Sequence, residues 1–272
     1  MATQQEKAAQ FLALHHRDRP FLIPNAYDAG IARVLESLGF EALATTSSGH
    51  AATLAKRDGA VTRDEALTHA TALCAATQIP ISSDFERGFA DAPADVAANV
   101  RLAAATGLAG LSIEDGTRNS DGPVYDAGLA AERVSAAAEA AHSGDVRMVL
   151  TARAENFIVG RPDLKDTIAR LQSYQAAGAD VLFAPGVRDL DDIRTVVSEV
   201  DLPVNVLIFP NGVTVEQLAE AGVKRISVGG ALAYAAIAAV ISAAEELRDQ
   251  GTVTFWESAA KGMQTAHAVF TP

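Results

Sequence analysis

The chain has little of several residue types, and each shortage excludes a class of protein. Cys74 is the only cysteine among 272 residues. Neither an intrachain disulfide nor a cysteine-rich zinc site can therefore form, and a cytoplasmic setting is expected. Lysine and arginine together number 22 against 34 acidic residues, a formal charge of −12. Because so acidic a chain repels phosphodiester backbones, nucleic acid is not an expected partner.

Long apolar runs are missing as well. Residues 1–10 are polar and do not resemble a signal peptide. The longest apolar stretch, residues 231–244, includes Tyr234 and Ser242 and is too short to cross a bilayer. We therefore expect no membrane partner.

A repeated pattern is present instead: an Ala- and Leu-rich helical stretch, a glycine and then a short apolar strand. The glycines are Gly39, Gly107, Gly178 and Gly222. A glycine just past a helix end relieves the left-handed conformation there, so each glycine predicts a helix stop before a buried strand. Counted in this way, the predicted strands are residues 21–23, 42–44, 81–83, 110–113, 148–150, 181–183, 204–207 and 226–228.

Eight short strands that alternate with helices predict an α/β fold with a parallel sheet. Helix starts are marked by two capping boxes, Thr62 with Glu65 and Thr214 with Gln217. A single (β/α)8 TIM-type barrel of roughly 250 residues fits this length. It is favoured over an open doubly wound sheet, because no strand is followed by Gly-x-Gly-x-x-Gly.

No linker-like segment interrupts the pattern, so residues 1–272 are predicted to form one domain. Helical residues precede the first strand, and a long helical tail follows the eighth. These extensions either pad the ends of the barrel or contact another subunit, and the residues leave both open. His15 and His16, in the first extension, are expected at the surface.

Charged residues stand where the predicted strands end, the position of active sites in such barrels. Asp84 and Glu86 follow the third strand, Glu114 the fourth and Arg153 the fifth. Close carboxylates repel one another, and a hard cation with oxygen ligands such as Mg2+ is the usual solution. Arg153 offers a fixed cation to a substrate carboxylate or oxyanion. The alternative is that the acids are solvated loop residues paired with nearby arginines.

Small polar residues mark two other strand ends. Ser48 and Gly49 could cradle a carboxylate or phosphate, or could form an ordinary turn. His50 is a candidate general base or an exposed loop residue. Gly229 and Gly230 could bind phosphate or allow close packing. No lysine ends a strand on this side, so a Schiff-base aldolase lacks its nucleophile.

These segments together resemble the isocitrate lyase/phosphoenolpyruvate mutase superfamily, from about residue 25 to residue 230. The superfamily hallmark Asp-x-Asp-x-Gly-Tyr-Gly reads Asp-Phe-Glu-Arg-Gly-Phe-Ala at residues 84–90. The Glu-Asp pair stands at residues 114–115, and Ala-Arg-x-Glu-x-Phe at residues 152–157. Ser48 and Gly49 are similar to its carboxylate-binding pair, and Asp58 to the acid of its gating loop.

The resemblance implies an α/β barrel, Mg2+ held mostly through waters and an oxo acid chelated to the metal. Members break or form C–C or P–C bonds next to an enolate, whose charge the metal and an arginine like Arg153 stabilise. It further implies a homodimer or homotetramer with the last barrel helix exchanged between subunits, which would account for the C-terminal tail.

Some positions depart from the superfamily pattern. Glu86 stands where most members have Asp, and Thr46 where the phosphonate mutases have Trp. The C–C lyases carry a lid with Lys-Lys-Cys-Gly-His, but residues 116–130 contain no Lys, Cys or His. An isocitrate or methylisocitrate lyase is therefore not expected. Asn119 is similar to a lid asparagine of the mutase group.

We expect a Mg2+-dependent enzyme that acts on a small α-oxo-carboxylate, such as oxaloacetate or a phosphonopyruvate-like compound. The site candidates are Arg153, Asp58 and Asn119 for catalysis, Thr46, Ser48, Gly49, Arg153 and Asp84 for substrate, and Asp84, Glu86 and Glu114 for metal. The alternatives are phosphoenolpyruvate mutase proper, an oxo-acid-binding protein with little catalysis, and a barrel for an unrelated phosphate-bearing substrate.

Overall fold

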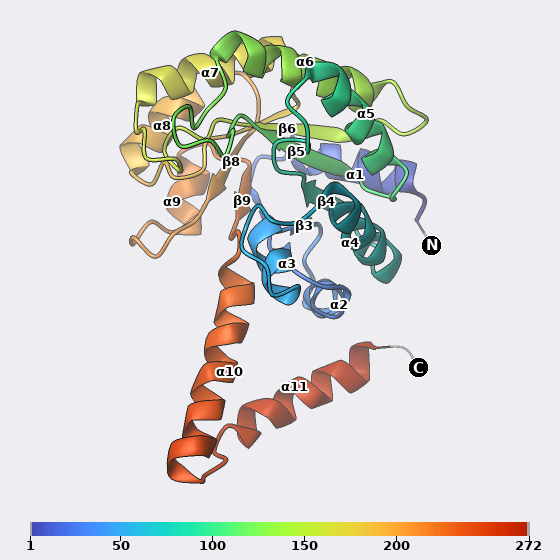
Figure 1. The fold of residues 1–272 in the computed structure, drawn as a ribbon, viewed down its shortest axis with the longest axis vertical. Helices are drawn as coiled ribbons and strands as arrows, with labels where there is room; N and C mark the ends of the chain where they lie inside the picture. Colours follow the sequence, from blue (N-terminus) through green and yellow to red (C-terminus); the bar gives the residue numbers. More distant parts are fainter. Residues whose placement is uncertain (1, 271–272) are drawn as a thin grey trace.

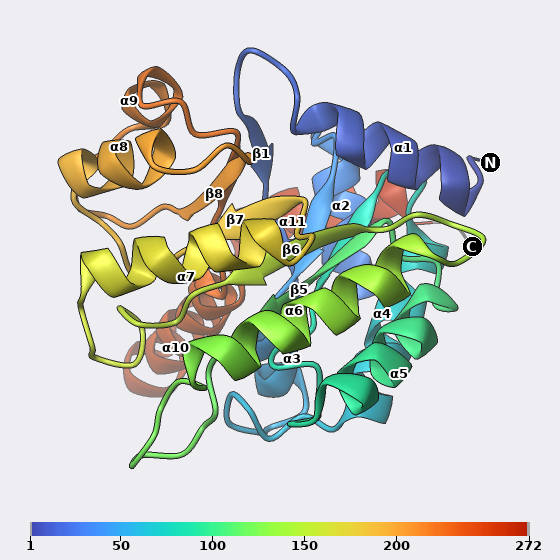
Figure 2. The ribbon, with the colours of Figure 1, turned by 90° about the horizontal axis from the view of Figure 1, so that it is seen from above.

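The computed structural model describes residues 2–270 and has a closed barrel of parallel strands at its centre (Figures 1 and 2). The strands are β1 (Phe21–Ile23), β2 (Asn25–Ala26), β3 (Leu43–Thr45), β4 (Ile81–Asp84), β5 (Gly110–Glu114), β6 (Val149–Arg153), β7 (Val181–Phe183), β8 (Val204–Leu207) and β9 (Arg225–Ser227). Their order in the sheet is β1-β9-β8-β7-β6-β5-β4-β3-β2. All eight predicted strands are confirmed.

The first strand closes the barrel because it pairs with both edges of the sheet. Its N-terminal part, β1, pairs with β9, and its C-terminal part, β2, pairs with β3. Pro24 separates the two parts since it has no backbone N–H to donate. Its carbonyl oxygen still accepts a hydrogen bond from the Ala44 N–H at 3.1 Å. The predicted barrel is therefore confirmed over the open sheet.

Helices cover the outside of the strands (Figure 2). They are α2 (Ala29–Ser37), α4 (Arg63–Ala76), α5 (Pro93–Ala104), α6 (Ala127–His142), α7 (Leu164–Ala176), α8 (Leu190–Ser198) and α9 (Val215–Glu220), while the short α3 (Ser47–Thr53) follows β3 at the C-terminal end of the barrel and contacts the helix that begins at residue 231. The four glycines predicted to stop helices all have φ between 87° and 98°. Both predicted capping boxes also form. The main hydrophobic core lies between these helices and the sheet.

Helix α1 (Gln4–Leu14) closes the N-terminal end of the barrel. Phe11 and Leu14 are fully buried against apolar side chains at the strand starts, such as Val149 and Val181. The N-terminal extension is therefore a plug. The expectation that His15 lies at the surface is wrong, because this residue follows the docked face of α1 and is 1% exposed.

Helices α10 (Ala231–Gln250) and α11 (Trp256–Val269) leave the barrel (Figure 1). Helix α10 extends away from the strands, and α11 returns until it contacts α2. Several apolar side chains of α10 are exposed, among them Val240 at 68% and Ile241 at 51%. Within residues 2–270, no helix has both the length and the apolar character to cross a membrane. Exchange of helices between subunits stays a prediction.

Candidate active site

A cavity of about 270 Å3 runs from the C-terminal ends of the strands into the barrel. Predicted site residues converge on it from four different segments of the chain. Those that line it are Thr46, Ser48, Asp58, Asp84 and Arg153. The cavity lies where barrels of this type carry their active sites.

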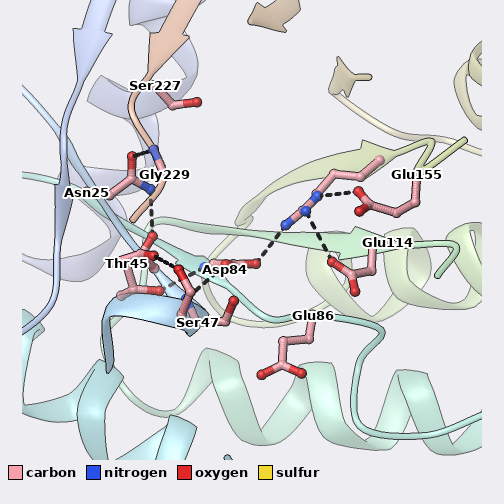
Figure 3. A network of polar contacts seen from close by, with 12 residues as sticks. Asn25, Thr45, Ser47, Asp84, Glu86, Glu114, Glu155, Ser227 and Gly229 are labelled. Carbon is pink, nitrogen blue, oxygen red and sulfur yellow. Dashed lines mark hydrogen bonds and ion pairs between the residues drawn. The ribbon is translucent and has the colours of Figure 1, made fainter. Parts of the chain in front are cut away.

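Asp84 is fixed at the edge of this cavity by main-chain and side-chain hydrogen bonds (Figure 3). Its N–H donates to Thr45 Oγ1 at 2.8 Å, and its Oδ2 accepts from the Ser47 N–H at 2.9 Å. Its Oδ1 accepts from Arg153 Nη1 at 2.8 Å. The end of β4 is thereby tied to the start of α3 and to β6, so this carboxylate has little freedom to turn.

Arg153 lies among three carboxylates, those of Asp84, Glu114 and Glu155, which Figure 3 labels. Its guanidinium contacts Asp84, Glu114 at 3.2 Å and Glu155 at 3.0 Å. Burial alone would lower the pKa of Arg153, but these acids together raise it above its usual range. Burial raises the pKa of Glu114 and of Glu155, and Arg153 offsets this only in part. One guanidinium does not neutralise three carboxylates, of which Glu114 and Glu155 are buried.

Glu86 is set apart from this group in Figure 3. It is buried and accepts from Arg118 Nη2 at 2.6 Å. Burial raises the pKa of Glu86 to about 7, although Arg118 opposes the shift. Glu86 and Arg118 have φ of 50° and 63°, a conformation that costs non-glycine residues about 1 kcal/mol or more and occurs often at functional sites.

The predicted gate and lid contact each other. Arg118 packs directly over Gly59, since a Cβ at residue 59 would lie 1.5 Å from Arg118 Nη1. The neighbouring Asp58 lines the cavity. Two loops distant in sequence therefore lie together above the strand ends, where they can exclude water.

The predicted carboxylate cradle lies at the start of α3. Thr46 caps this helix, and its Oγ1 lies 3.2 Å from Ser48 Oγ. The Gly49 N–H donates to Thr46 Oγ1 at 3.3 Å, so this group is already engaged. Gly49 itself does not line the cavity. Gly230 allows close packing here, because a Cβ at that position would lie 2.6 Å from Ser48 Oγ.

The predicted metal ligands do not converge on one point. Within residues 2–270, no group of three or more His, Cys, Asp or Glu side chains is placed to hold one metal ion. Of the three predicted ligands, Asp84 alone lines the cavity. The charge around it nevertheless suits a hydrated cation: Asp84, Glu86, Glu114 and Glu155 face only two guanidinium groups, those of Arg118 and Arg153. Mg2+ often keeps several of its water ligands when it binds to a protein. These carboxylates therefore fit a Mg2+ ion that is bound mostly through water.

Two other predicted residues lie away from the cavity. Asn119 is exposed in the loop after β5, where its Oδ1 accepts from the Asp121 N–H at 3.1 Å. Its catalytic role stays a prediction. His50 does not line the cavity but stacks on His69, with ring centroids 3.8 Å apart. The arrangement therefore gives no support to His50 as the general base.

Several cavity residues were missed in the sequence because they lie within the strands. Asn25 joins the first strand to the loop after β9: its Oδ1 accepts from the Gly229 N–H at 2.8 Å, and its Nδ2 donates to Thr45 O at 2.7 Å. Asn205, Arg225 and Ser227 line the deeper part of the cavity. Alternation along a three- or four-residue strand is too short a signal to show which side chains point inward.

The family model for phosphoenolpyruvate phosphomutase matches residues 11–248. The chain belongs to the phosphoenolpyruvate phosphomutase family. The resemblance of the strand-end motifs is thereby confirmed. As a member of this family, the protein carries Glu86 and Thr46 as departures within an otherwise recognisable site.

Similar proteins cover the full length of this phosphomutase family member. A Burkholderia cenocepacia J2315 structure, provisionally described as a lyase/mutase, is 48% identical with a TM-score of 0.95 and covers 99% of this chain and 97% of its own. Oxaloacetate decarboxylase of Pseudomonas savastanoi pv. phaseolicola is 29% identical over all of this chain and 94% of its own length. Phosphonopyruvate hydrolase, solved with oxalate and Mg2+, is 21% identical with a TM-score of 0.82, covers 99% of each chain and shares the fold.

Proposed function

We propose that this protein breaks or forms a C–C or P–C bond at the carbon that neighbours the oxo carbon of a small α-oxo-carboxylate, so that the electrons of the bond are held as an enolate, with Mg2+ as cofactor. The arrangement of Arg153 carries the proposal, because a guanidinium held by Asp84 and Glu114 at the mouth of a polar cavity can stabilise an enolate oxygen. Full-length similarity to an oxaloacetate decarboxylase supports the same reaction class.

Mg2+ would be held by Asp84 and, through water, by Glu86 and Glu114. When bound, it would act as a Lewis acid on the oxo and carboxylate oxygens of the substrate. The substrate carboxylate would accept from the Ser48 hydroxyl, which faces the cavity beside Thr46. Arg153 would donate to the oxygen that gains charge, without needing to move, because its carboxylate partners fix its plane.

The cavity favours reactions whose first step needs no protein acid. Among the described residues that line it, there is no His, Cys, Lys or Tyr. In decarboxylation, the electrons of the broken C–C bond pass to the enolate and CO2 leaves. The enolate can take its proton from water afterwards. A lyase that must protonate its leaving carbanion from a His, Cys, Lys or Tyr lacks that residue among those that line this cavity.

Turnover of oxaloacetate and phosphonopyruvate, with Mg2+ and with EDTA, tests the proposal. We expect metal-dependent turnover of one of them. Arg153→Lys should lower kcat by roughly 100-fold or more, because lysine keeps the charge but loses the planar guanidinium that donates several hydrogen bonds at once. Arg194→Gln, at an exposed position on α8, is the control. Turnover that persists in EDTA would exclude the metal role.

The missing acid also favours a second candidate, an oxo-acid-binding protein with little catalysis. Calorimetry distinguishes the two: tight binding of both oxo acids beside no product from either would support the second candidate. We also propose a cytoplasmic setting, on the basis of the composition, and a homo-oligomer, on the basis of the exposed apolar side chains of α10.

A further inference from the structure

The interior of the barrel is polar below the catalytic mouth. Barrels of this type usually fill the interior with bulky branched side chains. Here the cavity wall includes Ser82, Ser112, Asn205 and Ser227, and at its deep end Arg225. Small polar residues thus leave open a path from the mouth of the cavity to a guanidinium group.

Arg225 is the first residue of β9 and is 5% exposed. Its Nε donates to Asn205 Oδ1 at 2.8 Å, and its Nη1 donates to Thr151 Oγ1 at 3.0 Å. His15 Nε2 lies 3.4 Å from the same Nη1. Because His15 Nδ1 is 2.8 Å from Phe11 O, Nδ1 carries the proton and Nε2 accepts. Every partner of Arg225 is therefore neutral.

No acid within the described chain forms an ion pair with Arg225, in contrast to the three carboxylates around Arg153. Arg133, also buried without an ion pair, donates to three main-chain carbonyl groups and does not line this cavity. Burial, followed by the charge of Arg153, lowers the pKa of Arg225 to about 9, so the group is still charged at neutral pH. A buried charge without a counter-ion is costly, and an anionic ligand would relieve that cost.

We propose that Arg225, with Asn205 beside it, forms an anion subsite at the deep end of the cavity, and that it binds the second anionic group of a dicarboxylate substrate. The inference rests on the proposed function, since it takes the oxo-acid end of the same molecule to lie at Arg153. Oxo acids with two anionic ends are bound in preference to monocarboxylates of the same length. Arg225 is thus a specificity residue, while the reacting bond lies nearer the mouth.

Asn205→Asp tests this subsite without removing the arginine. The new carboxylate would lie beside Arg225 Nε and neutralise it in place, at almost the same volume, and Ser227 Oγ could turn to donate to it. Arg225→Gln removes the charge outright. Arg194→Gln is the surface control. Circular dichroism and urea unfolding establish that each variant is folded; if Arg225→Gln fails to fold, Asn205→Asp decides alone.

Calorimetry compares succinate with butyrate, two four-carbon acids that differ by one carboxylate. We expect the wild type to bind succinate at least tenfold more tightly than butyrate. A hydrogen bond to a charged group raises the affinity for a ligand by roughly 10- to 150-fold. In folded Asn205→Asp and Arg225→Gln this preference should fall to within about twofold. A wild type without the preference, or variants that keep it, would overturn the proposal.

The subsite and the proposed function fail in different ways. If the wild type turns over oxaloacetate and Asn205→Asp changes neither KM nor the succinate preference, the subsite is wrong and the function stands. If no oxo acid is turned over but the preference depends on Arg225, the function is wrong and the subsite stands. A purely structural role for Arg225 predicts altered unfolding with unchanged ligand preference.

Discussion

At the scale of single residues, the acid cluster makes stability depend on pH. Burial raises the pKa of Glu86 to about 7 from an ordinary value near 4.5. Since the folded pKa is the higher one, the stabilisation is complete below pH 4.5 and is lost as pH rises through 7. We expect metal-free Glu86→Gln to be more stable than the wild type at pH 8, by at most about 3 kcal/mol, and the difference to shrink towards pH 4.

Urea unfolding in EDTA at pH 4, 6 and 8 measures this effect. Glu132→Gln, an exposed position on α6, should leave the pH profile unchanged. Parallel profiles for the wild type and Glu86→Gln would show that Arg118 compensates the burial of Glu86 fully and that its pKa is not raised.

Residues at the C-terminal end of a strand could be predicted from the sequence, but residues further inside a strand could not. Asp84 and Arg153 stand at the ends of apolar runs, so their place on the barrel follows from the strand itself. Arg225 is instead the first residue of β9, at the end of the barrel opposite the mouth, where the sequence gives no reason to expect a site residue. Its guanidinium stays at that end, beside His15 and Thr151, and no local pattern predicts that the cavity reaches so far into the barrel.

At the scale of helices and strands, local sequence signals predicted where helices begin and end, but not where α1 docks on the barrel. Glycine stops and capping boxes depend on neighbours a few residues away, so four helix ends and two helix starts could be predicted. The docking of α1 depends on contacts with strand starts more than a hundred residues distant, such as Val149 and Val181. The sequence left its role open for that reason.

The docking of α1 is testable through Phe11, which is fully buried in the plug. Phe11→Ala removes a large side chain from a site closed on all sides by helix and strands, and should destabilise the fold by about 3–5 kcal/mol. Gln10→Ala, the exposed neighbour, should change stability by less than about 0.5 kcal/mol. Chemical denaturation gives both values. A small effect at Phe11 would mean that α1 is detached in solution.

At the scale of the whole molecule, the barrel buries its apolar side chains within one chain, and the C-terminal helices do not. The strands β3 to β9 are each paired on both sides, and β1 and β2 together close the ring, so the repeated unit in the sequence was enough to predict the barrel. Helix α10 instead exposes apolar side chains over much of its length, including Tyr234, Ile237, Val240, Ile241 and Leu247. A helix with so much exposed apolar surface requires a partner.

We predict that a second copy of the chain supplies this partner through exchange of α10 and α11. Sedimentation velocity should show a dimer or tetramer at micromolar concentration. Ile241→Glu, which places a charge at a 51% exposed apolar position of α10, should shift the protein towards monomer while the barrel stays folded by circular dichroism. Gln250→Glu adds the same charge at the exposed end of α10 and should leave the assembly intact. A wild type that sediments as a monomer would mean that α10 and α11 fold back onto their own barrel, and Ile241→Glu would then change stability but not mass.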